Sequence, residues 1–359
     1  MDFGLSEEQQ QLKTSARELL AGECPTTAVR KAMASDDGTI PELYREIAKL
    51  GWTGLIVPEL FGGAGLGMLD MAVLLEEQGY AAMPGPFLFS SVLATEAIMR
   101  GGSDELKAKW LPALAEGKAV GTIAITETSD RIPKIAKDGR LSGSQIFVPY
   151  GKLADFIVVS ARSEAGGAAH TVVETKSSGV RVMPLKHLDL TRRFAGVDFD
   201  GASGSLLSGG ESLNQRLLDV AAVAIAADSL GGMERALDMA VDYSKVREQF
   251  GKPIGSFQAL KHAAAEIVAD LEPARSLLWY AAYLLDAMPQ QASRAAAMAK
   301  ARLCEVYSRG TDRAVLMHGG IGFTWEHDIH LWFKRARFNE TYLGSPAYYR
   351  ERVAQLGGY

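Results

Sequence analysis

Apolar residues recur at helical spacing in the first third of the chain. Ser6 stands where an N-cap is expected, and acidic residues follow it at once, so we predict a helix that begins after Ser6. A second helix is predicted from Pro41 to Leu50, because Gly51 supplies a C-terminal stop. The apolar stripe of the first helix consists of Leu12, Ala16, Leu19 and Leu20.

The pattern changes near Val120. Short β-prone runs, separated by Gly, Asp and Ser turns, continue from there to about Gly210, and helical periodicity returns at Leu213. The clearest runs are Gly121–Thr126, Ile157–Ser160 and Thr171–Val173. This order predicts an α+β multidomain fold. The expected domains are a helical one at residues 1–119, a β-domain at 120–212 and a helical bundle at 213–359.

Two long helical patterns meet at a turn within Asp219–Ala282. The turn is the string Gly251-Lys-Pro-Ile-Gly255, in which glycine and proline interrupt the helical period. Spacing alone predicts a helical hairpin with an exposed arginine and a phenylalanine packed under the bend.

Composition is that of an ordinary soluble globular protein. The chain has 359 residues, 47% hydrophobic and 23% charged, which is too long for one compact core and predicts two or three domains. The formal net charge is −5 and no block of Lys and Arg occurs, which argues against nucleic acid or an anionic membrane surface as the main partner. No apolar run is long enough to span a bilayer, and the N-terminus lacks the regions of a signal peptide, so we expect a cytoplasmic protein.

The cysteines and histidines indicate neither a disulfide nor a metal site. Cys24 and Cys304 are far apart in sequence, so reduced thiols are expected. His318, His327 and His330 are close in sequence, but no cysteine or acidic cluster completes a zinc pattern.

Several segments carry motifs that occur together in one family. The most specific is the string Arg247-x-x-Phe-Gly-x-Pro-Ile-x-x-Phe-Gln258. The others are Pro58–Gly67, Ser103–Gly117 and His318–Glu326. Together they resemble the acyl-CoA dehydrogenase family over nearly the whole chain. The resemblance implies that family's fold, with a helical N-terminal domain, a central β-barrel-like domain and a C-terminal four-helix bundle. It also implies FAD as cofactor, an acyl-CoA thioester as substrate and electron-transfer flavoprotein as electron acceptor.

The resemblance further implies residues that bind the cofactor. Arg247, Phe250 and Gln258 match residues on a helix that reaches across a subunit interface to a neighbour's FAD. A guanidinium can bind a diphosphate bidentately there, and an aromatic ring can cover an apolar ring edge. Gly319 and Gly320 match a turn whose backbone comes close to the adenine end of the cofactor, which only glycine permits.

Three further cofactor candidates lie in the β-domain. Thr126 and Ser129 fall in a segment that resembles the family's polar stretch facing the flavin, although several of its residues are missing and a plain polar turn is the alternative. Phe147 keeps the aromatic platform for the isoalloxazine ring. Two positions depart from the family pattern: Pro149 replaces a residue whose hydroxyl bonds the ring, and Leu316 replaces a glutamine before the glycine-rich turn.

The family's catalytic base is missing from both of its known positions. Removing a proton next to a thioester carbonyl needs a carboxylate within hydrogen-bond reach of that carbon. Leu343, in the string Tyr342-Leu-Gly-Ser345, occupies one position of the base, and Ala221 occupies the other, on the helix before Arg247.

Two explanations compete for the missing base. Another acid can serve, with Glu340 and Asp228 as candidates, although a solvated helix face or a cap is the commoner role for such residues. Alternatively, a second chain supplies the base, as in α2β2 family members that act on steroid side chains, where one shortened subunit lacks the Glu. We expect the second arrangement, with a homologous Glu-bearing partner subunit. A homotetramer that uses Glu340, and a non-catalytic structural subunit, are the alternatives.

Overall fold

The computed structural model describes residues 4–125, 132–136, 138–164 and 166–359. The chain forms two compact units, each built from segments that are distant in sequence. The first, which we call the helical unit, combines Met1–Val29, Ala72–Met83 and Ala222–Tyr359. The second, the sheet unit, combines Arg30–Met71 and Pro84–Ala221.

The first helix begins where the sequence predicts. In α1 (Glu7–Glu23) the hydroxyl of Ser6 accepts from the Gln9 amide at 3.2 Å, and the Gln9 side chain accepts from the Ser6 amide at 3.0 Å. This reciprocal pair is a capping box, which satisfies two amides that a bare helix end would leave unpaired. Ala16 and Leu20 of the predicted stripe are buried.

The rest of the N-terminal third is also helical, as predicted. The second predicted helix is α3, which has Pro41 at its first position and ends before Gly51, whose φ of 80° is left-handed. The elements are α2 (Thr26–Ala34), α3 (Pro41–Lys49), η1 (Trp52–Gly54), η2 (Glu59–Phe61), α4 (Met68–Tyr80), the π-helical η3 (Leu88–Ala94), α5 (Thr95–Gly101) and α6 (Asp104–Ala115).

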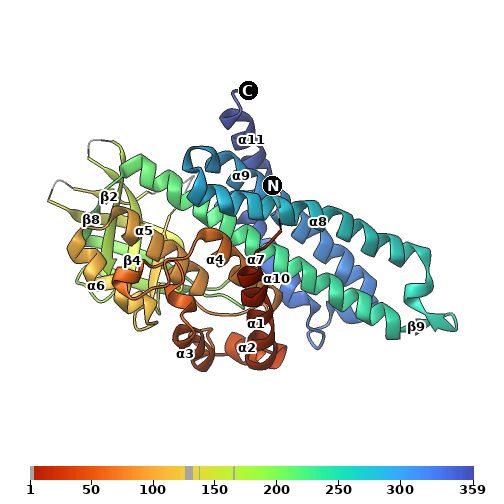
Figure 1. Ribbon diagram of the computed structural model, residues 1–359. Coiled ribbons are helices and arrows are strands. Elements are labelled where there is room, and N and C mark those ends of the chain that lie inside the picture. The colour runs from red at the N-terminus through yellow and green to blue at the C-terminus, as the bar shows by residue number, and fades with distance from the viewer. Residues whose placement is uncertain (1–3, 126–131, 137, 165) are drawn as a thin grey trace. The chain divides into compact units, whose positions relative to one another are not determined.

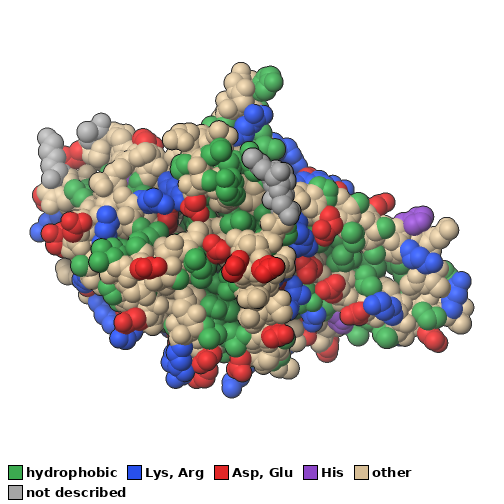
Figure 2. Space-filling model, viewed as in Figure 1, with side chains coloured by type: hydrophobic (Ala, Val, Ile, Leu, Met, Phe, Trp, Pro, Cys, Tyr) green, Lys and Arg blue, Asp and Glu red, His purple; other side chains and the backbone are tan. Residues whose placement is uncertain are grey.

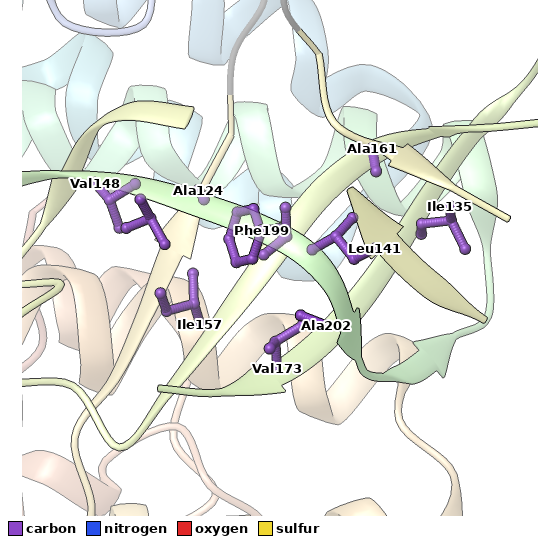
Figure 3. Packing of buried hydrophobic residues seen from close by; sticks show 11 residues of the cluster. Ala124, Ile135, Leu141, Val148, Ile157, Ala161, Val173, Phe199 and Ala202 are labelled. Carbon is purple, nitrogen blue, oxygen red and sulfur yellow. The ribbon is translucent and has the colours of Figure 1, made fainter. Parts of the chain in front are cut away.

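A β-sheet follows, and β1, β4 and β5 confirm the three predicted runs. Its strands are β1 (Gly121–Ala124), β2 (Lys134–Ile135), β3 (Arg140–Pro149), β4 (Phe156–Ser163), β5 (Ala168–Glu174), β6 (Val180–Leu185), β7 (Phe194–Ser203) and β8 (Ser205–Leu207). The strand order is β6-β7-β3-β2-β4-β5-β8, and β1 pairs in parallel with β4. Figure 3 shows the core on one face, where Leu141 and Phe199 pack with residues from neighbouring strands. Leu141 and Val148 of β3 contribute to this face, although register shifts between Leu141 and Gly143 and between Gln145 and Val148 interrupt the regular alternation of the strand.

Long helices return after the sheet, and the predicted helical hairpin is confirmed (Figure 1). The elements are α7 (Gly210–Val246), β9 (Glu248–Gln249), β10 (Lys252–Pro253), η4 (Ile254–Ser256), α8 (Gln258–Ala287), α9 (Pro289–His318), η5 (Gly319–Phe323), α10 (Ile329–Thr341) and α11 (Pro346–Leu356). None of the helices in the described part of the chain is both long and apolar enough to cross a membrane.

Adjacent buried carboxylates on α4 hold the helical unit together. The side chains of Glu76 and Glu77 have no exposed surface, and burial raises the pKa of Glu77 despite its ion pairs with Arg17 and Lys13. Lys13 contacts Glu76 at 2.5 Å, and Arg275 also pairs with Glu76. These pairs tie α1 and α8 to α4, which explains why the N-terminal helix belongs to the same unit as the C-terminal helices.

The predicted domain boundaries at 119/120 and 212/213 stay a prediction. Strands begin at Gly121 and end at Leu207, and α7 begins at Gly210, so the change of secondary structure lies near both positions. The division into two compact units, however, cuts within α7, between Ala221 and Ala222. A sequence pattern reports the local period, whereas a compact unit depends on contacts between distant segments.

A glycine contact between α4 and α7 gives a direct test of this packing. A Cβ added at Gly231 would overlap the Glu76 carbonyl oxygen, whereas a Cβ at Gly22, in α1, would meet nothing within 4 Å. We expect Gly231→Ala to lower the free energy of unfolding by about 3 kcal/mol through overpacking. Gly22→Ala should raise it by about 0.5 kcal/mol, because alanine is the better helix former. Urea unfolding of both variants measures the difference, and equal effects would contradict the packing described.

Candidate functional site

The connection between α7 and α8 is a two-residue β-hairpin. Gln249 pairs with Lys252, and the residues between them, Phe250 and Gly251, have φ values of 55° and 73°. Positive φ at both central positions is the geometry of a type I′ turn, which costs a non-glycine residue about 1 kcal/mol. The Phe250 side chain is 91% exposed, so the expectation of a phenylalanine packed under the bend is wrong. A strained and exposed aromatic residue without burial in its own chain indicates contact with something outside it.

The two polar candidates lie at the ends of the same connection. Arg247 directly follows α7 and is exposed, and Gln258 is the first residue of α8 and is also exposed. Among the described residues no carboxylate lies within 4 Å of the Arg247 guanidinium. This connection thus presents a guanidinium, an aromatic ring and an amide to the outside, although the Phe250 ring also makes an edge-to-face contact with Phe257, with centroids 6.0 Å apart.

The glycine-rich turn after α9 has open space beside it. Gly319 has φ 64° and ψ −143°, a region that favours glycine, and a Cβ added at Gly319 or Gly320 would meet nothing within 4 Å. By contrast, a Cβ at Gly322 would lie 2.7 Å from the Val315 carbonyl oxygen. The chain's own packing therefore explains Gly322 but not Gly320, whose lack of a side chain leaves backbone accessible from outside.

Aromatic stacking joins the glycine turn to the end of α7. The rings of Tyr243 and His318 stack with centroids 4.8 Å apart, and the His327 ring lies 4.4 Å from that of His318. Arg247 stands one helical turn after Tyr243, so the guanidinium and the glycine turn come from adjacent segments. The described residues contain no group of three or more His, Cys, Asp or Glu placed to hold a metal ion.

Large apolar side chains are exposed around these two segments. In Figure 2, hydrophobic and basic side chains appear together at the right-hand end, over the tip of the α7–α8 hairpin. The exposed apolar residues are Val246, Phe250, Leu316, Ile321, Phe323 and Trp325, with exposed fractions from 44% to 91%. Apolar exposure on this scale is typical of an interaction surface.

The β-domain candidates belong to the sheet unit. Phe147 lies in a bulge of β3, where the register with β7 shifts between Gln145 and Val148, and it has φ 57° with half of its side chain exposed. The bulge accompanies an aromatic ring that is half exposed on the strand. Pro149 ends β3, and its carbonyl accepts from the Thr122 hydroxyl. Thr126 and Ser129 lie outside the described residues.

Neither family position of the base carries an ionisable group. Leu343 follows α10 with φ 55°, and Gly344 follows with φ 109°. Ala221, in α7, is 1% exposed. Glu340, the candidate for an alternative base, already has two partners. Its carboxylate accepts from the Ser308 hydroxyl of α9 at 2.8 Å and pairs with Arg337 at 3.2 Å.

Asp228 is not on a solvated helix face, nor is it a cap. It is 1% exposed and forms an ion pair with Arg335, itself 3% exposed, whose Nε lies 3.1 Å from both carboxylate oxygens. The Asn339 amide donates a further bond at 2.7 Å. The expected solvated role was wrong because it treated the aspartate alone. Its partner lies 107 positions away, and the only sequence signal was the spacing of Trp332, Arg335 and Asn339 on one helical face.

Comparison with known proteins decides the family. Acyl-CoA dehydrogenase IpdE2 of Mycolicibacterium smegmatis is 37% identical over 98% of this chain and 98% of its own length. This chain belongs to the acyl-CoA dehydrogenase family. The family's N-terminal domain matches residues 6–118, and its C-terminal domain matches residues 208–357.

Two similar solved structures extend the comparison. The ChsE4-ChsE5 complex from Mycobacterium tuberculosis contains a chain with a TM-score of 0.94 and 30% identity, covering 100% of this chain and 99% of that one. A variant of the steroid ACAD Tcur3481-Tcur3483 has a TM-score of 0.92 and 30% identity, covering 98% of each chain. The acyl-CoA dehydrogenase fold predicted from the sequence, with a helical first part, a β middle and a helical last part, is confirmed.

The stack at the glycine turn is expected to depend on pH. The Nδ1 of His318 donates to the Ala314 carbonyl, and burial lowers the pKa of this histidine below its usual value near 6.5 despite that bond. A lowered folded pKa means that the neutral imidazole stabilises the turn fully above pH 6.5, and that this contribution is lost as the pH falls through the lowered pKa. The facing titratable groups are Tyr243 and His327.

We therefore expect amides of residues 319–323 to lose protection from hydrogen exchange between pH 7.5 and 5.5, after correction for intrinsic rates. His318→Phe keeps an aromatic ring against Tyr243 and removes the titration, so its protection should not change with pH. The same pH dependence in both proteins would contradict the assignment to His318.

Proposed function

We propose that this chain is the subunit lacking the catalytic base in a heteromeric, FAD-dependent acyl-CoA dehydrogenase. The reaction oxidises an acyl-CoA to the 2-enoyl-CoA, and electron-transfer flavoprotein takes up the electrons. The observation that carries the proposal is a contrast within one unit. Arg247, Phe250 and Gln258, which suit the cofactor, are exposed, whereas Leu343 stands where the resemblance places the base.

The hairpin fits a dinucleotide cofactor held at a subunit interface. Arg247 has the planar fork of donors that matches a diphosphate bidentately, and no described carboxylate competes for it. Phe250 offers an exposed ring for an apolar edge, and Gln258 offers an amide at the start of α8. The open space beside Gly319 and Gly320 allows the adenine end to approach the backbone. FAD, when bound, supplies the acceptor for the hydride.

The chain's own residues would bind and orient rather than transfer the α-proton. Phe147, raised by the β3 bulge, would lie against the flavin ring, with Thr126 and Ser129 as further polar contacts. Leu343 cannot accept a proton, and Asp228 is neutralised by Arg335. Glu340 accepts from Ser308 and pairs with Arg337, contacts that fix it against α9. We infer that a homologous Glu-bearing partner supplies the base.

The relatives support a heteromeric enzyme and suggest a substrate class. The ChsE4-ChsE5 structure is a complex of two differently named chains, and the Tcur3481-Tcur3483 structure is titled a steroid ACAD. We extend both features to this chain as proposals: an α2β2 assembly, and an acyl-CoA substrate whose acyl part is a steroid side chain or a related alicyclic group. A homotetramer that uses Glu340, and a structural subunit without flavin, are the alternatives that the following experiments exclude or support.

The cofactor role of Arg247 can be tested without affecting the fold. Arg247→Met, in the chain purified with its partner subunit, should weaken FAD affinity by roughly 2 kcal/mol, or about thirtyfold, because a charge-assisted contact is lost. Stability should not change, because the guanidinium is exposed. Arg45→Met removes an exposed guanidinium that pairs with Glu42 and donates to the Pro41 carbonyl, and it serves as control. Unchanged FAD content in Arg247→Met, by absorbance per chain, would favour the structural-subunit alternative.

The source of the base can be tested by substitution at Leu343. Leu343→Glu should restore dehydrogenase activity to a complex whose partner subunit has lost its own Glu, while Leu343→Gln, which matches it in size, should not. Glu340→Gln should leave the activity of the complex unchanged within about twofold, since a surface carboxylate bound to Arg337 contributes little. The assay is reduction of an electron acceptor by an acyl-CoA. Loss of activity in Glu340→Gln, together with activity of the wild-type chain alone, would contradict the proposal.

A further inference from the structure

The helical unit contains a cavity whose lining includes no residue of the α7–α8 connection or of the glycine turn. Its volume is about 260 Å³, and α1, the segment after it, α4, α7 and α10 form its walls. The residues that matter for its chemistry are Arg17, Leu20, Cys24, Tyr80, Arg235 and Trp332. At roughly 30 Å³ per water molecule, the cavity has room for about nine waters, or for a small organic molecule.

Arg235 is the charged side chain of this cavity that has no ion-pair partner in the described part of the chain. Its guanidinium is half-buried, and among the described residues no carboxylate lies within 4 Å of it. Its contacts are one long hydrogen bond to the Tyr80 hydroxyl, at 3.4 Å, and the ring faces of Tyr80 and Trp332, at 5.3 and 5.8 Å. A guanidinium carries five N–H donors, so most of them are left for water or for a ligand.

The other charges at the cavity are already paired with each other. Arg17 binds Glu77 bidentately and also contacts Glu234 at 3.0 Å. The pKa of Arg17 is raised by these two carboxylates, although burial alone would lower it. Glu234, which directly precedes Arg235, also pairs with Arg275, and Asp238, three residues after Arg235, accepts from the Tyr80 hydroxyl at 2.8 Å. The lining itself holds two arginines and one glutamate, and so a net positive charge.

The remaining wall is apolar. Leu20, Ala81 and Trp332 supply hydrocarbon surface, and burial raises the pKa of Cys24 to about 12, so its thiol stays uncharged at neutral pH. An apolar pocket with one unneutralised guanidinium is complementary to a molecule that joins a single negative charge to a compact hydrophobic body. A carboxylate matches the fork of a guanidinium in geometry as well as in charge.

We propose that this cavity is a binding site for a small monocarboxylate with an aromatic or alicyclic body. The carboxylate binds the free N–H groups of Arg235, and the ring packs against Leu20, Ala81 and Trp332. A phosphate ester fits less well, because a second negative charge would face the Glu77 carboxylate in the lining. The site is independent of the cofactor residues on the hairpin, and it does not depend on the function proposed above.

The test uses benzoate and benzamide, which have the same shape and differ in charge. Titration calorimetry of the full chain, purified with any partner subunit, should show saturable binding of benzoate and at least tenfold weaker binding of benzamide. Arg235→Met should abolish this preference, whereas Arg350→Met, which removes an arginine paired with Glu305 outside the cavity, should retain it. Ala21→Phe fills the exposed edge of the cavity with Arg235 intact and should weaken both compounds.

Three results would overturn the proposal. They are the absence of saturable benzoate binding, benzoate affinity within twofold of wild type in Arg235→Met, and equal losses in the Arg235 and Arg350 variants. If Arg235→Met does not fold, Ala21→Phe decides: unchanged benzoate affinity in that variant would exclude the cavity as the site.

Discussion

The buried ion pair between Asp228 and Arg335 is the interaction on which the arrangement of the helical unit depends. Both side chains are almost fully buried, and Asn339 completes the hydrogen bonding of the carboxylate. Removing one member of such a pair leaves an uncompensated buried charge, which costs about 3 to 5 kcal/mol. The pair therefore fixes α10 against α7 in one register. Lys300, 1% exposed, adds a contact by donating to the Asn339 carbonyl near the end of α10.

That fixed end of α10 leads directly to Leu343. The backbone there is left-handed, with φ 55°, a conformation that leucine adopts at a cost and that nothing in its own side chain favours. The turn at which we propose that the base is missing thus combines a demanding backbone geometry with an apolar side chain. The exposed connection between α7 and α8 combines a strained turn at Phe250 with the Arg247 guanidinium, which has no carboxylate partner among the described residues. A subunit whose site is completed by another chain needs a rigid interior and exposed side chains that can bind outside the chain.

Local features of the fold could be predicted from the sequence because their causes are local. Ser6 and Gly51 mark helix ends through backbone hydrogen bonding and left-handed geometry within a few residues of themselves. The α7–α8 helical hairpin could also be predicted, because glycine and proline in its turn act locally. The grouping of α1 and α4 with the last helices was not, because it depends on ion pairs such as Arg275 with Glu76, 199 positions apart. Spacing alone favoured a Phe250 ring packed under the bend, which is wrong, because spacing cannot distinguish a ring under a bend from one at its tip. The family resemblance implied an outward-reaching Phe250, and the side chain is exposed.

The candidate site was predictable only in part. The resemblance supplied Arg247, Gln258 and the glycine turn, and the structure adds that their side chains or backbone face outward. The resemblance could not predict the contacts of the two acids, because Asp228 pairs with Arg335 and Glu340 accepts from Ser308, and each partner lies on another helix. Arg235 also escaped notice, since an arginine on a long helix is usually solvated, and only the three-dimensional structure reveals that no carboxylate of the described residues pairs with it.

The most direct test of the central claim is the FAD-to-chain ratio and acyl-CoA oxidation of this protein, measured first alone and then after co-expression with a homologous Glu-bearing subunit. Our account predicts that the chain alone holds little flavin and oxidises no acyl-CoA, and that the co-purified complex is yellow and active. One FAD per subunit and acyl-CoA oxidation by the chain alone would contradict it.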